Sequence, residues 1–187
     1  MGRVIVTEFV SLDGVMEAPG GEEGYAHTGW VFPYHDDASL AYKLDELQKA
    51  DAHLLGRVTY EGFAAAWPSR EGPFGDKMNA MPKYVASTTL TEPLDWNNSS
   101  LLQGSVPEAV PQLKQQHDGD IVVAGSRTLV HSLMEHGLID EYRLMIFPVV
   151  LGSGRRLFPD APDPTPMKLV DTRAFETGVV VQAYEPA

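Results

Sequence analysis

Strand and helix patterns alternate along most of the chain, and this alternation constrains the fold more than any other feature of the sequence. Apolar runs typical of buried strands occupy residues 3–10, 52–56, 83–88 and 120–125, with a weaker run at 99–104. Helical spacing is found from residue 36 or 37 to 50, and at residues 57–67, 106–117 and 126–137. Three more strand patterns, at residues 141–152, 167–175 and 178–184, have no helix between them. This order predicts one α/β domain over residues 1–187, with a mixed, mostly parallel sheet, helices on both faces and an antiparallel C-terminal hairpin.

Two stretches carry further local signals. In the helix that ends at residue 50, Leu40, Leu44 and Leu47 fall on one face, as in an amphipathic helix. Acidic residues stand at its N-terminal end, where they suit the helix dipole. Residues 68–82 are rich in proline and glycine, and the sequence predicts no helix there.

Composition and charge exclude several classes of function. The chain has 187 residues, with 14 Lys and Arg against 26 Asp and Glu, and a formal net charge of −12. That balance disfavours nucleic acid and anionic lipid, because both need a basic face. With no cysteine there are no disulfides or thiolate metal sites, and the histidines lack metal-ligand spacing. Acids interrupt the N-terminal run too early for a signal peptide or membrane span, so we expect a cytoplasmic protein.

Two strand-to-helix junctions share one chemistry. Each has a glycine at the end of a strand, then an arginine and a hydroxyl group in the first turn of a helix. The residues are Gly56, Arg57 and Thr59 at the first junction, and Gly125, Ser126, Arg127 and Thr128 at the second. Such a helix start favours phosphate, and a nucleotide with several phosphates could bridge both junctions. The alternative is two tight turns, with Ser126 as an ordinary helix cap.

Asp13 lies just after the first strand, beside Gly14. A carboxyl group there could protonate or orient a substrate near a cofactor, and the alternative is a plain Asp-Gly turn. Gly152-Ser153-Gly154, followed by two arginines, is only a weak phosphate signal by itself.

The long loop at residues 15–36 is rich in glycine, proline and aromatic residues. Loops of this length in compact domains are often functional. Trp30 and Phe32 could form an apolar lid over a flat substrate ring. They could equally form a small core of the loop itself.

Four segments together resemble the dihydrofolate reductase-like superfamily. They are VSLDG at 10–14, LLGRVTYEGF at 54–63, VASTTL at 85–90 and the run from DIVVAG to RRLF at 120–158. More narrowly, the chain resembles the C-terminal reductase domain of the bifunctional deaminase–reductase of riboflavin biosynthesis, in its free-standing form. The resemblance covers about residues 3–184, and its most specific part runs from Gly125 to Phe158.

The resemblance implies a sheet of about eight strands, NADPH as hydride donor and a homodimer. It places cofactor-binding residues in four segments, which comprise Ser11 and Val15; Gly56, Arg57, Thr59 and Tyr60; Ser87 and Thr88; and Ala124, Gly125, Ser126, Arg127, Thr128 and Leu129. Two departures are visible: Ala124-Gly125-Ser126 replaces the double glycine of dihydrofolate reductases, and Glu8 and Phe9 stand where the riboflavin enzyme has a lysine.

The sequence therefore predicts an NADPH-dependent reductase that acts on a small flat heterocyclic or carbonyl substrate, pterin-like or ribosylaminopyrimidine-like. Asp13 is the predicted proton-handling residue, and Trp30 and Phe32 are the predicted substrate contacts. The alternative is a module that binds NADP(H) or another nucleotide as a sensor, without turnover.

Overall fold

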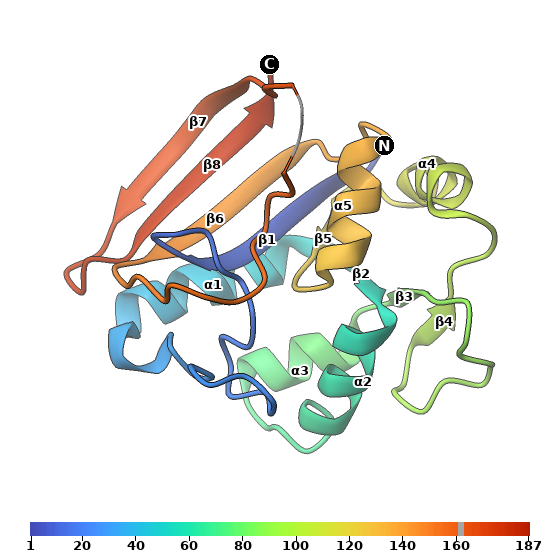
Figure 1. The fold of residues 1–187 in the computed structure, drawn as a ribbon. Helices are drawn as coiled ribbons and strands as arrows, with labels where there is room; N and C mark the ends of the chain where they lie inside the picture. Colours follow the sequence, from blue (N-terminus) through green and yellow to red (C-terminus); the bar gives the residue numbers. More distant parts are fainter. Residues whose placement is uncertain (161–162) are drawn as a thin grey trace.

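One eight-stranded sheet runs through the protein in a computed structural model that describes residues 1–160 and 163–187 (Figure 1). The strand order is β4-β3-β2-β5-β1-β6-β8-β7. The strands are β1 (Arg3–Ser11), β2 (Ala50–Gly56), β3 (Lys83–Ala86), β4 (Ser99–Leu101), β5 (Asp120–Val123), β6 (Glu141–Phe147), β7 (Met167–Ala174) and β8 (Val180–Pro186). The pairings from β4 to β6 are parallel, and β8 is antiparallel to both of its neighbours. The predicted mixed α/β sheet with an antiparallel C-terminal hairpin is confirmed.

Helices cover both faces of the sheet. They are α1 (Asp37–Lys49), α2 (Arg57–Ala66), α3 (Pro73–Ala80), α4 (Val106–Gln116) and α5 (Arg127–Glu135), with a short 3-10 helix η1 (Phe32–Tyr34) before α1. The alternation of β1 separates the two layers, because successive side chains of a strand point to opposite faces. Val4 and Val6 pack in one cluster with residues of α4 and α5, whereas Ile5 packs with residues of α2 and α3.

Helix α1 is rotated relative to the orientation that its leucines suggest. Ser39 and Glu46 are its buried residues, and Leu40 is 40% exposed. The cause lies in the sheet beneath: the Lys43 ammonium donates hydrogen bonds to Thr7 of β1 and to Glu46. A polar strand surface therefore faces the polar side of α1, which the periodicity of the helix alone does not encode.

The proline- and glycine-rich stretch at 68–82 contains a helix that the sequence analysis missed. Helix α3 begins at Pro73, directly after Gly72 with φ +88°. Proline is tolerated in the first turn of a helix because the N–H group that it lacks has no intrahelical partner there. The breakers therefore mark the start of a helix rather than its absence.

The hairpin of β7 and β8 extends beyond the helical layers, with β7 as the last strand of the sheet (Figure 1). Next to it, Phe147 and Phe175 pack with Trp30 and Val31 of the long loop. No helix in the described ranges, 1–160 and 163–187, has the length and apolar composition that crossing a membrane requires.

Candidate functional site

The two glycine junctions meet at the carboxyl edge of the sheet, because β2 and β5 are neighbouring strands. The Gly56 N–H donates a hydrogen bond of 2.8 Å to Ser126 Oγ. A Cβ atom on Gly125 would lie 3.0 Å from the side chain of Thr59. The prediction that one ligand can contact both junctions therefore has its geometric basis in the fold.

The starts of α2 and α5 carry no side-chain cap among the described residues. Ser126 is at the cap position of α5, but its hydroxyl group accepts the Gly56 N–H, so the interpretation of Ser126 as an ordinary cap is wrong. By contrast, Asp36 and Ser39 form a reciprocal capping box at the start of α1. The first-turn N–H groups of α2 and α5 therefore remain as donors for an anion.

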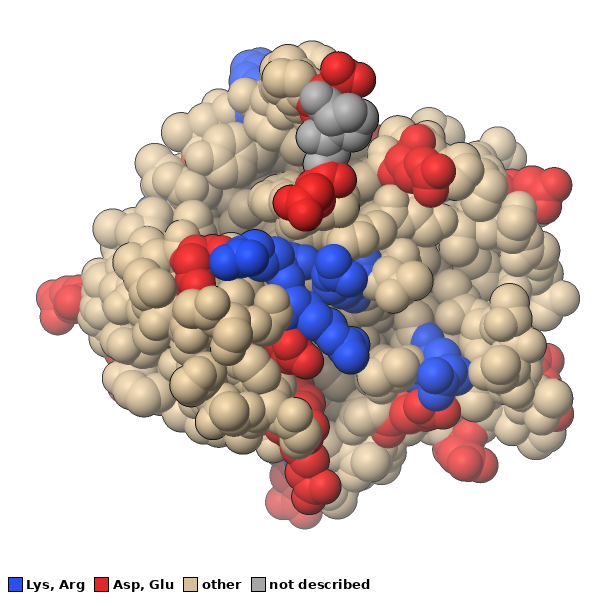
Figure 2. Space-filling model, in the orientation of Figure 1, with Lys and Arg blue, Asp and Glu red and all other residues tan. Residues whose placement is uncertain are grey.

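Three arginines lie next to the start of α5. Arg127 Nε donates to the Arg156 carbonyl at 2.8 Å, and Arg156 Nε donates to the Asp13 carbonyl at 2.9 Å. Arg155 lies beside them and pairs with Glu17 at 3.5 Å. Figure 2 shows basic side chains gathered near the middle of one face of this acidic protein. The weak signal at residues 152–156 thus belongs to the same region as the two junctions.

Arg57 makes a 2.8 Å ion pair with Glu61, one turn later in α2. Both side chains are largely exposed. Such surface pairs contribute little to stability, so the guanidinium group can exchange its partner for a ligand phosphate.

Asp13 joins the loop after β1 to the loop after β6. Its carboxylate accepts hydrogen bonds from the Ser11 hydroxyl group at 2.6 Å and from the N–H groups of Leu151 and Gly152 at 3.1 and 2.8 Å. The bond from Ser11, followed by those from the two backbone groups, lowers the pKa of Asp13 to about 2. Asp13 is therefore ionised at neutral pH, which disfavours proton donation, and its predicted role in proton handling stays a prediction.

Ser11 and Val15 lie in the same tight loop. Ser11 is buried, and its Oγ accepts the Val15 N–H at 2.9 Å. Val15 is buried as well and forms an isolated bridge with Arg156. Both residues thus lie at the carboxyl end of β1, next to Arg156.

Three of the predicted contact residues have core positions instead. The Tyr60 hydroxyl group accepts the Trp96 N–H at 3.1 Å, and Leu129 packs in the cluster beneath α5. Trp30 is buried, donates from Nε1 to the Glu17 carbonyl at 2.8 Å and packs edge-on against Phe147. Trp30 thus packs against the sheet rather than in a separate core of the loop, and the side chains of all three residues are buried.

The remaining predicted residues stay accessible at the same edge. Phe32 is 60% exposed, so its predicted contact with a substrate stays a prediction. Ser87 follows β3, and its hydroxyl group accepts the Thr89 and Leu90 N–H groups at 3.1 and 3.0 Å. Thr88 and Thr128 are exposed, and Ala124 is half-buried at the end of β5.

Two titratable residues near β1 were missed by the sequence analysis. Glu8 is buried in β1, and its carboxyl group accepts the Gly125 N–H at 3.0 Å. A charged residue inside an apolar strand pattern was the available signal for Glu8. His35 lies against the rings of Phe9 and Phe147, at centroid distances of 6.0 and 5.8 Å. No local signal marked His35, because the two phenylalanines come from strands far away in the sequence.

Burial lowers the pKa of His35, and the neighbouring Asp36 partly offsets this effect. Its Nδ1 atom is buried and has no hydrogen-bond partner within the described part of the chain. Phe147, against which His35 packs, is paired with Ser11 at the end of β1, directly before the loop of Asp13.

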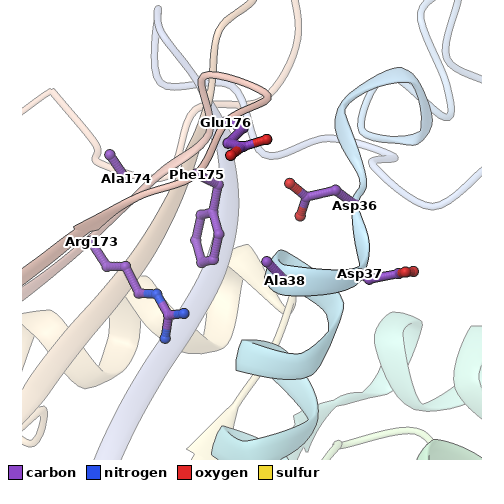
Figure 3. A pocket seen from close by; sticks show the side chains of 7 residues that line it. All are labelled: Asp36, Asp37, Ala38, Arg173, Ala174, Phe175 and Glu176. Atoms are coloured by element: carbon purple, nitrogen blue, oxygen red, sulfur yellow. The ribbon is translucent and has the colours of Figure 1, made fainter.

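An open hollow lies between the start of α1 and the turn after β7 (Figure 3). It is lined by Asp36, Asp37, Ala38, Arg173, Ala174, Phe175 and Glu176. Asp36 is engaged as the cap of α1, and the Arg173 guanidinium lies 5.1 Å from the centre of the Phe175 ring. None of the predicted site residues is among these lining residues, so the hollow is separate from the glycine junctions.

Comparison with known proteins identifies the family. The model of the RibD C-terminal domain matches residues 3–181. The chain belongs to the RibD C-terminal domain family. Its relatives include the uncharacterized proteins YyaP and YwjB of Bacillus subtilis (strain 168). YyaP is 33% identical over 97% of this chain and 94% of its own length, and YwjB is 30% identical over 94% and 92%.

Solved structures share the fold of this RibD C-terminal domain. A candidate riboflavin biosynthesis protein of Shewanella sp. PV-4 superposes with a TM-score of 0.75 at 20% identity, over 99% of both chains. A pyrimidine reductase-like protein of Corynebacterium diphtheriae gives 0.64 at 13% identity, over 100% of this chain and 92% of that one. RibD of Acinetobacter baumannii gives 0.66 at 16% identity, and the match covers 58% of that longer chain. The resemblance to a dihydrofolate reductase-like α/β fold is confirmed.

Proposed function

We propose that this protein is an NADPH-dependent reductase that transfers hydride to a small flat heterocyclic or carbonyl substrate, pterin-like or ribosylaminopyrimidine-like. Membership in the RibD C-terminal domain family supports a reductase-type role. The observation that carries the proposal is the contact between two helix starts that lack side-chain caps in the described structure, with Arg127 and Arg156 beside them.

The residues at this edge fit a dinucleotide with several phosphates. The first turns of α2 and α5 supply N–H donors, Thr59 and Ser126 supply hydroxyl groups, and Arg127 supplies a guanidinium group. When bound, NADPH supplies the hydride, and the protein supplies position and electrostatics. Distant acidic residues do not prevent this, because charges more than ~8–10 Å away are screened at physiological salt.

The other side of β1 carries an aromatic cluster, in which Phe9 and Phe147 meet edge-to-face at 5.4 Å and Phe147 is fully buried. We propose that the flat ring of the substrate binds beside this cluster, next to His35. A hydride acceptor such as C=N also needs a proton, and Asp13 is ionised and engaged in three hydrogen bonds. His35 is the titratable residue packed against both rings, and we assign the proton to it.

Loss of NADPH absorbance, followed with a panel of pterins, pyrimidines, flavins and quinones, tests the proposal. Oxidation with at least one flat substrate supports the reductase. Saturable NADPH binding without oxidation of any compound would favour the alternative, a sensor that binds NADP(H) without turnover. Absence of saturable binding would contradict both functions.

A homodimer is also expected. The last strand, β7, exposes Leu169 and Val170, with exposed fractions of 48% and 42%. An edge strand with unpaired backbone groups and apolar side chains is suited to association with another chain. Light scattering after size-exclusion chromatography distinguishes a dimer from a monomer, and a monomeric mass would contradict this expectation. The cytoplasmic location stays a prediction.

A further inference from the structure

Burial of Glu8 at the centre of this sheet is energetically unfavourable. The residue lies in β1, between β5 and β6, and is only 5% exposed. Val6 and Val10, on the same face of the strand, belong to the apolar cluster that α5 covers. A carboxyl group in such a place costs desolvation free energy unless its oxygens are fully hydrogen-bonded.

The hydrogen bonds of Glu8 are incomplete. Oε2 accepts the Gly125 N–H at 3.0 Å, whereas Oε1 is buried and has no partner in the described ranges of the chain. Stability alone therefore does not account for a carboxyl group here, because an apolar side chain of similar size would avoid the unpaired oxygen.

Within residues 1–160 and 163–187, the one side-chain hydrogen bond of Glu8 is with the turn at the start of α5. Gly125 and Ser126 have φ values of +69° and +65°, so two successive residues adopt the left-handed conformation that is unfavourable for the non-glycine one. Two contacts hold this turn: Glu8 of β1 accepts the Gly125 N–H, and Ser126 accepts the Gly56 N–H from β2. The turn is thus attached to the strands on both sides of β5.

We infer that Glu8 is a positioning residue for the phosphate-binding turn, and that it fixes Gly125 and Ser126 in the conformation that a dinucleotide needs. The inference rests on the proposed function. It adds a residue 117 positions away in sequence from the glycine that it holds.

Electrostatics are compatible with a carboxyl group close to a phosphate site. Burial raises the pKa of Glu8 well above its ordinary value, while the hydrogen bond from Gly125 and the charge of Lys43 act in the opposite direction. Burial thus favours the uncharged carboxyl group, which repels an anion less than a carboxylate does, and Oε2 accepts the Gly125 N–H.

Three variants, with NADPH affinity measured by fluorescence titration and stability by urea unfolding, test the inference. Glu8→Met removes the acceptor but keeps the length of the side chain. We expect its Kd to rise about tenfold, which corresponds to ~1.4 kcal/mol, while the urea midpoint stays equal or increases. Glu8→Gln keeps a neutral acceptor, and we expect its Kd to stay within about threefold of the wild-type value, since the hydrogen bond is preserved.

Thr7→Val is the matched control. Thr7 is the preceding buried residue of β1, but it points to the opposite face and contacts Lys43 and Glu46. We expect Thr7→Val to leave the Kd unchanged. Equal weakening by Glu8→Met and Thr7→Val would overturn the inference, because it would indicate a general disturbance of the strand.

A Glu8→Met protein that binds NADPH as tightly as the wild type would also overturn the inference, while the proposed function would stand. Absence of saturable binding by the wild type would overturn both. If Glu8→Met does not fold, hydrogen exchange in the ligand-free wild type decides: the Gly125 amide must be protected, since it donates to Glu8. A rapidly exchanging Gly125 amide would overturn the inference.

Discussion

Helices α1 and α5 start at the same edge of the sheet, on opposite faces of β1. Their N-termini differ in how the first-turn N–H groups are satisfied. The start of α1 is closed by the capping box of Asp36 and Ser39. The start of α5 lacks a side-chain cap in the described structure, because Ser126 is used to hold Gly56. Protein side chains thus satisfy one helix terminus, while the backbone donors of the other remain for a ligand.

The two faces of β1 also differ in the side chains that they present to these two helices. Glu8 holds the glycine turn on the α5 side, whereas Phe9 forms part of an aromatic cluster with His35 on the α1 side. The first side fits a charged ligand that backbone donors and arginines recognise. The second side carries His35 and closely packed aromatic rings. Successive residues of a strand point to opposite faces of the sheet, so ligands bound on these two sides could meet only beyond the carboxyl end of β1.

The largest expected effect on NADPH affinity is that of Gly125→Ala, which places a side chain at the start of α5. The new Cβ would lie 3.0 Å from Thr59, at a φ of +69°. We expect the Kd for NADPH to rise about 100-fold, from the backbone strain and the contact together. Fluorescence titration measures it.

Gly137→Ala is the control for backbone strain. Gly137 follows α5 at its other end, has a φ of +61° and has open space around a new Cβ. It should lower stability without a change in NADPH affinity. Equal losses of affinity in both variants would show that strain, and not the site, is responsible.

His35→Gln tests the aromatic side of β1. We expect kcat to fall about 30-fold, as for the loss of a general acid, with the Kd for NADPH unchanged. Burial lowers the pKa of His35, so its charged form increases as pH falls below neutral. Wild-type turnover should therefore rise toward acid pH, and this rise should be absent in His35→Gln.

The control for that variant is His136→Gln. His136 is exposed and bonds to the Ser132 carbonyl in the last turn of α5. Turnover and its pH profile should not change. A pH profile of His35→Gln that matches the wild type would exclude His35 as the proton donor.

Arg127→Ala should weaken NADPH binding about tenfold, a loss typical of one charge-assisted hydrogen bond. The loss should be smaller at high salt, because the contact is ionic. Arg70→Ala is the matched control, since that guanidinium stacks on Trp67 at 4.5 Å. Unchanged NADPH affinity in Arg127→Ala would show that the arginines do not contact the cofactor.

The smallest effect is expected at the capped helix. Asp36→Ala opens the capping box of α1 and should lower the midpoint of urea unfolding by roughly half a molar. NADPH affinity should stay constant. Asp37→Ala removes a neighbouring acid that lies one position inside the helix, and it should have a smaller effect on the midpoint. A loss of NADPH affinity in Asp36→Ala would contradict the division between the two helices.

The sequence predicted the neighbourhood of the two glycine junctions, whereas the packing of the residues assigned to the substrate depended on the fold. Gly56 and Gly125, with the arginines and hydroxyl groups that follow them, are local patterns, and they meet in the fold. Trp30 was assigned to the substrate but packs against Phe147 of β6. Asp13 was assigned to proton handling, and the structure shows that its carboxylate also joins two loops. His35 was missed because its partners Phe9 and Phe147 are distant in sequence.

By itself, the sequence determined the order of the strands and of the helices other than α3 and η1, and the glycine turns at the starts of α2 and α5. These features depend on side-chain periodicity and on backbone conformations that few residues tolerate, and both are local properties. The tertiary structure decided the hydrogen bonds of Glu8 with Gly125 and of Asp13 with Gly152. It also decided that α1 turns its polar side toward the sheet. These contacts join residues whose proximity depends on which strands are neighbours, and periodicity along one segment carries no information about that order.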